Sequence, residues 1–145
     1  MEGSKQRIVV GVDGSAGSRA ALRWALGYAE GCGGRVVAVF ACGVPALIDV
    51  ALMMPEEERV LTVGERELRK AVDETYAESD TGIPVERRVV RQDAVRALLD
   101  EARDSDLLVV GRRGHGRFAQ VLLGSVSWHC VNHAPCPVVV VSGPG

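Results

Sequence analysis

Residues 106–117 read Asp-Leu-Leu-Val-Val-Gly-Arg-Arg-Gly-His-Gly-Arg, a short apolar block followed directly by a loop rich in glycine and arginine. A short, nearly continuous apolar run is typical of a strand that is buried on both faces of a parallel sheet. Four other blocks have the same character, and with Asp106–Gly111 they predict five strands: Arg7–Asp13, Arg35–Cys42, Val85–Arg91 and Pro137–Ser142.

Helical patterns lie between the predicted strands. Either Ser15 or Ser18 could cap the first helix, and Asp93 could cap the third. The second helix is expected from about Glu57 to Ser79, and a short fourth helix from Ser125 to before Pro135. In the second helix the residues expected to face the sheet are Leu61, Gly64, Leu68, Val72 and Thr75. The apolar residues form one stripe in the first helix, Ala21, Leu22, Ala25, Leu26 and Ala29, and in the third they are Val95, Leu98, Leu99 and Ala102.

The alternation of strands and helices predicts the α/β fold class, because repeated βαβ units cross over right-handedly into a parallel sheet. We expect one doubly wound domain over residues 1–145, which is close to the most common domain size. Its five-stranded parallel sheet should have the order 3-2-1-4-5, with helices on both faces.

Composition excludes several classes of partner. Seventeen Lys and Arg against 19 Asp and Glu give a net charge of -2, so we expect no nucleic-acid partner. Apolar runs such as Val138–Val141 are far shorter than the ~20 residues that span a bilayer. We therefore expect no membrane segment and a cytoplasmic location. The four cysteines include no Cys-x-x-Cys pair and are expected to be reduced, mostly buried thiols.

One connection is unusually long. Residues 43–55 are largely apolar, and loops of this length are often lids or binding flaps. A helical turn packed on a neighbouring element or on a partner subunit explains the same pattern equally well.

The chemistry is expected where the strands end, because ligands of open parallel sheets bind beyond the carboxyl ends of the strands. Asp13 stands at the tip of the first strand, and the glycine loop follows the fourth. Glycines allow backbone amides to approach an anion, and a helix N-terminus carries a partial positive charge. Together with Arg112, Arg113 and Arg117, this pattern predicts a polyphosphate site.

The spacing Gly-x2-Gly-x9-Gly-Ser, at Gly111, Gly114, Gly124 and Ser125, makes the sequence resemble the universal stress protein family and its ATP-binding branch. The resemblance also covers Ile8–Ser15 and His133–Val141. It implies that Asp13 and the backbone near Val39 to Ala41 flank adenine and ribose. It also implies that ribose and phosphates are held by Gly111, Arg113, Gly114, Gly124, Ser125, Val126 and Ser127.

Two features near this pattern have alternative explanations. Gln92 stands where many members of the family carry glycine, so the turn before the third helix is expected to differ, with Gln92 reaching the nucleotide edge. His129 and His133 are spaced like a metal pair, but no acidic residue completes a ligand set nearby. We therefore assign no metal site, and we expect the two histidines to line a helix face.

The sequence thus predicts an ATP-binding universal stress protein that acts as a nucleotide-dependent stress-response or regulatory module, with ATP bound alone or with Mg²⁺. We expect a homodimer formed through Val138–Val141, and no catalytic residue is assigned. The alternative is a slow ATPase or a self-phosphorylating protein. A flavodoxin-like FMN protein is disfavoured, because its phosphate loop follows the first strand, whereas the glycine loop here follows the fourth.

Overall fold

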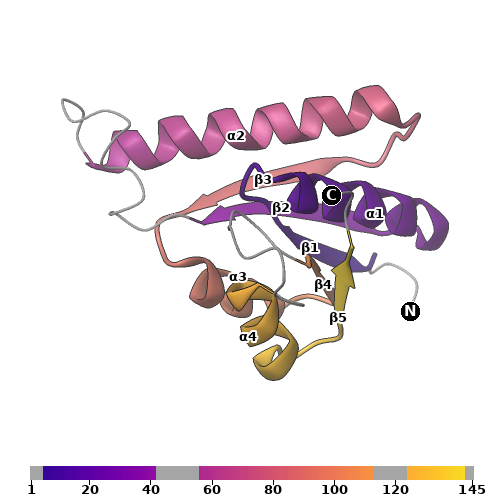
Figure 1. Cartoon of the computed structure of the whole chain (residues 1–145). Coiled ribbons are helices and arrows are strands. Elements are labelled where there is room, and N and C mark those ends of the chain that lie inside the picture. Colours follow the sequence, from indigo (N-terminus) through magenta and orange to yellow (C-terminus); the bar gives the residue numbers. More distant parts are fainter. Residues whose placement is uncertain (1–4, 42–55, 113–123, 143–145) are drawn as a thin grey trace.

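The computed structural model describes residues 5–41, 56–112 and 124–142 of the chain. Strands and helices alternate along these residues (Figure 1). In chain order the elements are β1 (Arg7–Gly11), α1 (Ala16–Cys32), β2 (Arg35–Ala41), α2 (Glu56–Glu78), β3 (Val85–Val90), α3 (Ala94–Ala102), β4 (Leu107–Gly111), α4 (Ser125–His133) and β5 (Val138–Val141). The predicted elements are confirmed, with bounds that differ by one or two residues.

The five strands form one parallel sheet in the order β3-β2-β1-β4-β5, as predicted. Helices α1 and α2 cover one face, and α3 and α4 cover the other (Figure 1). Successive strand residues alternate between the two layers. Val10 packs in the α1 and α2 layer, whereas Val9 packs with Leu98 of α3 and Cys130 of α4. Burial on both faces explains why the strand sequences are nearly continuous in apolar residues.

The two edge strands differ in character. On β3 the side chains of Glu86, Arg87 and Arg88 are exposed, so the expected apolar continuity is limited there. Charged side chains on an edge strand discourage pairing with another chain. Strand β5 consists of four valines, all half-buried, and in the described chain it pairs only with β4.

The helix caps follow the sequence signals. Ser15 is the N-cap of α1, where its side chain accepts a hydrogen bond from the Ser18 amide, so the first of the two cap candidates is confirmed. Asp93 caps α3 by accepting from the Arg96 amide. In α2 the predicted inward residues Gly64, Leu68, Val72 and Thr75 are buried, whereas the side chain of Leu61 lies outside the description.

The thiols only partly match expectation. Cys130 is buried and Cys136 is half-buried, but Cys32, the last residue of α1, is exposed. The long connection at 43–55 lies outside the described residues, so its predicted role stays a prediction. None of the helices in the described ranges is long and apolar enough to cross a membrane.

Candidate functional site

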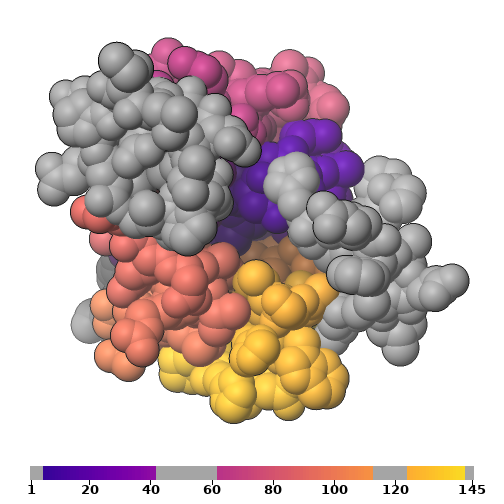
Figure 2. All heavy atoms as spheres, turned by 60° about the vertical axis from the view of Figure 1, so that its left-hand side comes forward, coloured from indigo at the N-terminus to yellow at the C-terminus, as the bar shows by residue number. Residues whose placement is uncertain are grey.

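The candidate site lies at the carboxyl edge, by which we mean the edge of the sheet where β1, β2 and β4 end. Figure 2 looks toward this side of the molecule. Atoms of the early chain, of α3 and of α4 meet near the centre of the view, although they are far apart in sequence. The predicted polyphosphate site therefore corresponds to a real convergence of segments.

The turn from β1 into α1 fixes Asp13. One carboxylate oxygen of Asp13 accepts a hydrogen bond from the Ser15 amide at 2.9 Å, which is the geometry of an Asx turn. The Asp13 amide in turn donates to the hydroxyl of Ser18 at 3.2 Å, and Ser18 is 4% exposed. Gly14 has a φ of 84°, a conformation that glycine adopts without strain. The Asp13 side chain is thus held by its own loop.

The tip of β4 packs directly on the first turn of α1. A Cβ atom at Gly111 would stand 2.7 Å from the carbonyl carbon and oxygen of Gly17. No side chain fits at that distance, so glycine at position 111 allows the two backbones to approach. Because Ser18 in the same turn holds Asp13, this contact places the ends of β1 and β4 side by side.

The junction between β4 and α4 is closed by hydrogen bonds. The Gly124 amide donates to the Arg112 carbonyl at 2.8 Å, and the Arg112 amide donates to the Val141 carbonyl at 2.8 Å. The hydroxyl of Ser127 lies 2.5 Å from the Gly111 carbonyl and 3.2 Å from that of Arg112. Arg112 and Gly124 are therefore held together, and Arg112 is hydrogen-bonded to the end of β5.

The N-terminus of α4 offers amides rather than a side-chain cap. Its N-cap is Gly124, which makes no side-chain capping hydrogen bond. The first turn closes where the Trp128 amide donates to the Gly124 carbonyl. The amides of Ser125, Val126 and Ser127 precede that bond, so helical geometry gives them no acceptor within α4. Such a terminus favours a bound anion.

The predicted site residues fall into three groups according to where the structure places them. The structure brings Asp13, Gly111 and the start of α4 together at the carboxyl edge, and the last group comprises Gly124, Ser125, Val126 and Ser127. Val39 has a buried side chain, and its carbonyl accepts a hydrogen bond from the Val12 amide. Ala41, the last residue of β2, is the described β2 residue nearest the edge. Arg113 and Gly114 lie outside the described residues.

Two residues that shape the site were not predicted for it. Gly17 receives the tip of β4, and Ser18 holds the backbone of Asp13. The repeated serine at Ser15 and Ser18 indicated a helix start, but only Ser15 caps the helix, and the Ser18 hydroxyl instead accepts a hydrogen bond from the Asp13 amide. The contact across 94 residues of sequence between Gly17 and Gly111 explains why position 111 carries no side chain.

The two histidines of α4 lie on its exposed face, as expected. Their rings stack with centroids 6.2 Å apart, and Nδ1 of His129 lies 2.8 Å from the Ser125 carbonyl. Among residues 5–41, 56–112 and 124–142, no group of three or more His, Cys, Asp or Glu side chains could hold a metal ion. We therefore assign no metal site to the histidine pair.

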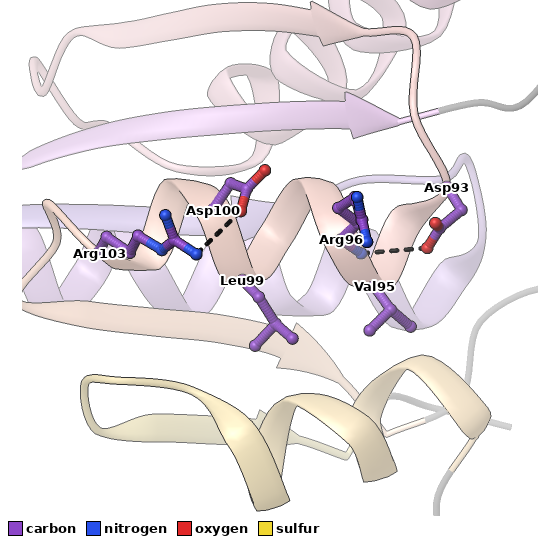
Figure 3. A pocket seen from close by; sticks show the side chains of 6 residues that line it. All are labelled: Asp93, Val95, Arg96, Leu99, Asp100 and Arg103. Carbon is purple, nitrogen blue, oxygen red and sulfur yellow. Dashed lines mark hydrogen bonds and ion pairs between the residues drawn. The ribbon is translucent and has the colours of Figure 1, made fainter.

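A shallow groove of about 470 Å³ runs along α3 and is a second place to consider (Figure 3). Val95 and Leu99 point toward α4 and form its apolar part. Arg103 pairs with Asp100 at 3.7 Å, and Asp93 caps the helix. The described lining comes from one helix and brings no convergent polar groups together, so the carboxyl edge is the stronger candidate.

Comparison with known proteins identifies similar sequences and structures. A sequence model of the Universal stress protein family matches residues 5–142. A universal stress protein of Mycolicibacterium smegmatis is 33% identical over 141 residues, which cover 94% of this chain and 48% of that relative. One from Mycobacterium tuberculosis is 34% identical over 140 residues, covering 92% of this chain and 46% of the relative. The chain thus spans about half the length of these curated relatives.

A solved structure with the same fold carries a ligand. It is a universal stress protein in complex with cAMP, with 27% identity, a TM-score of 0.72, and coverage of 97% of this chain and 98% of that one.

Proposed function

Because the chain belongs to the universal stress protein family, we propose that it binds ATP at the carboxyl edge and acts as a nucleotide-dependent regulatory module. The observation that carries this proposal is the side-by-side arrangement of the Asp13 turn and the uncapped N-terminus of α4. One element suits the adenosine end of a nucleotide, and the other suits its phosphates.

The phosphate end is assigned to the start of α4. Its first amides have no acceptor in the helix, and Gly124 brings no side chain between them and a ligand. The glycine spacing adds Gly114 and Arg113 to this end on the strength of the family signature. An anion there would be stabilised by the amide hydrogen bonds and by the helix dipole.

The adenosine end is assigned to the β1 turn and the end of β2. Asp13 accepts a hydrogen bond from the Ser15 amide, and an ionised carboxylate offers about four lone-pair sites in all. Ribose hydroxyls are donors that a carboxylate accepts well. The hydrogen bond from the Val12 amide to the Val39 carbonyl keeps the ends of β1 and β2 adjacent, so a base and a sugar could contact both.

The relative with cAMP bound supports an adenine nucleotide as the ligand class. Triphosphate is proposed over monophosphate because the glycine spacing matches the ATP-binding branch and the arginines near it supply charge. Mg²⁺ is proposed as an optional companion of the phosphates.

We further propose a two-fold homodimer through β5. Strand β5 is an edge strand of four valines without a charged side chain, whereas the opposite edge, β3, exposes Glu86, Arg87 and Arg88. An uncharged edge favours pairing with a second strand, and a strand can pair with its own copy about a two-fold axis. Light scattering at micromolar concentration should give twice the chain mass, and a monomer there would refute the dimer.

The ligand can be identified directly. Mass spectrometry of small molecules released by denaturing the purified protein should detect an adenine nucleotide, and calorimetric titration should show saturable binding of ATP. Titrations with AMP, cAMP and FMN under the same conditions provide the comparison. Binding of FMN in preference to every adenine nucleotide would overturn the proposal.

A further inference from the structure

Ser125 and Ser127 open α4 two residues apart, yet their side chains lie in different surroundings. Ser125 is exposed, whereas Ser127 is 3% exposed. Each residue of an α-helix advances the side-chain direction by about 100°, so positions two apart point to opposite sides of the helix. The two serines therefore cannot face one ligand from the same side of α4.

The hydroxyl of Ser127 is already engaged. Its oxygen lies within hydrogen-bond distance of the carbonyl groups of Gly111 and Arg112, which both belong to the end of β4. A serine hydroxyl has a single proton, and carbonyl oxygens only accept. That proton is directed at the β4 backbone and is not available to a phosphate oxygen at the same time.

From this geometry we propose that Ser127 is a positioning residue, which ties the first turn of α4 to the tip of β4 and so aims the α4 amides at the phosphates. The proposal rests on the proposed nucleotide site and gives its two serines different roles. Ser125 faces the ligand, and Ser127 fixes the direction of the amides. The Gly111 carbonyl is the key acceptor, because Gly111 also packs on Gly17 of α1.

This arrangement has a consequence for ligand selectivity. If Ser127 orients the α4 amides, its loss should weaken the binding of phosphates and leave the adenosine end intact. General damage to the fold would instead weaken every ligand alike. A neutral hydrogen bond contributes about 1 kcal/mol, so the expected loss of ATP affinity is roughly five- to tenfold.

The experiment compares ATP and adenosine binding by calorimetry in the wild type, Ser127→Ala, Ser127→Thr and Ser79→Ala. Ser79 is a matched control, because its half-buried hydroxyl also donates to a backbone carbonyl, that of Thr75, at the far end of α2. Ser127→Ala should lower the affinity for ATP but not for adenosine. Threonine at position 127 retains the hydroxyl and should restore ATP binding, and Ser79→Ala should change neither affinity.

Two results would overturn the proposal: unchanged ATP affinity in Ser127→Ala, or an equal loss for ATP and adenosine. If the wild type binds neither ligand, the proposed function fails, and amide hydrogen exchange then decides the positioning role separately. The Gly124 amide, which donates to the Arg112 carbonyl, should exchange faster in Ser127→Ala than in the wild type. An unchanged exchange rate would contradict the tie between β4 and α4.

Discussion

Gly111 at the end of β4 lies so close to Gly17 in α1 that a Cβ at position 111 would stand 2.7 Å from the carbonyl carbon and oxygen of Gly17. This contact changes the interpretation of one glycine in the signature. Gly111 was predicted as part of a phosphate cradle, but its lack of a side chain is already required by the packing of strand on helix. A ligand contact by its backbone stays a prediction.

Substitution of Gly111 should therefore act on stability first. We expect Gly111→Ala to lower the free energy of unfolding by about 1–3 kcal/mol, because the methyl group overlaps the Gly17 backbone. Gly27→Ala is the matched control in α1, since a Cβ at Gly27 meets no described atom within 4 Å. It should stabilise the protein by about 0.5–1 kcal/mol. Urea denaturation measures both, and a Gly111→Ala variant as stable as the wild type would contradict the packing argument.

An ion-pair network around Arg7, at the end of the sheet where β1 begins, should matter for stability and not for ligand binding. The carboxylate of Glu101, 13% exposed, lies 2.8 Å from Arg7 and 3.2 Å from Arg88. Glu101→Gln places an amide donor against one guanidinium and should cost about 1–3 kcal/mol of unfolding free energy.

The control for that variant is Asp100→Asn, which removes the more exposed pair with Arg103 and should cost about 0–1 kcal/mol. Thermal or urea unfolding compares the two variants. A loss in Asp100→Asn equal to that in Glu101→Gln would show that burial of the Glu101 network adds nothing. ATP affinity should be unchanged in both.

Alkaline stability should depend on Cys130. Burial, with a smaller contribution from Cys136, raises the pKa of the Cys130 thiol from 9.0 to about 11. The unfolded chain then loses this proton at lower pH than the folded chain, so the stability that depends on the neutral thiol is present below pH 9 and is lost as pH rises toward 11.

Urea unfolding between pH 8 and pH 10.5 tests this dependence. Cys130→Ala should show a shallower decline in unfolding free energy than the wild type, whatever its stability at pH 8. Cys32→Ala, with the exposed thiol at the end of α1, should retain the wild-type slope. Identical slopes in Cys130→Ala and the wild type would count against the buried neutral thiol.

We expect ATP to be bound without efficient turnover. Phosphoryl transfer needs a positioned nucleophile and a carboxylate that acts near the γ-phosphate, usually through Mg²⁺. Asp13 is tied by the Ser15 amide and is assigned to the adenosine end. Phosphate release from excess ATP with Mg²⁺ should be negligible over minutes. Several turnovers per minute that disappear in Asp13→Ala would make the protein an ATPase.

The sequence predicted the layers of the fold well, because burial on both faces of the sheet leaves a direct pattern. Val9 and Val10 face opposite layers, and both had to be apolar. The charged part of β3 broke this pattern because an edge strand is only partly covered. The exposure of Cys32 could not be predicted from residue type, since it depends on where α1 ends over the sheet.

The site was predicted less completely than the fold. Asp13 and the start of α4 were predicted because turn residues and glycine spacing are local signals. The opposite orientations of Ser125 and Ser127 follow from helix geometry, but the acceptor of Ser127 lies 16 residues earlier, on β4. Contacts of this kind depend on the tertiary fold, and single-sequence patterns do not encode them.

We expect the Asp13 turn and the start of α4 to form one adenine-nucleotide site. Calorimetric titration of ATP into the wild type, Asp13→Asn and Asp106→Asn tests it most directly. Both aspartates accept a hydrogen bond from a backbone amide, that of Ser15 for Asp13 and that of Arg7 for Asp106. Asp106, however, lies where β1 and β4 begin, at the end of the sheet opposite to the carboxyl edge. We predict at least a tenfold, or ~1.4 kcal/mol, loss of ATP affinity in Asp13→Asn alone. Equal affinity in all three proteins, or no saturable binding of ATP to the wild type, would contradict it.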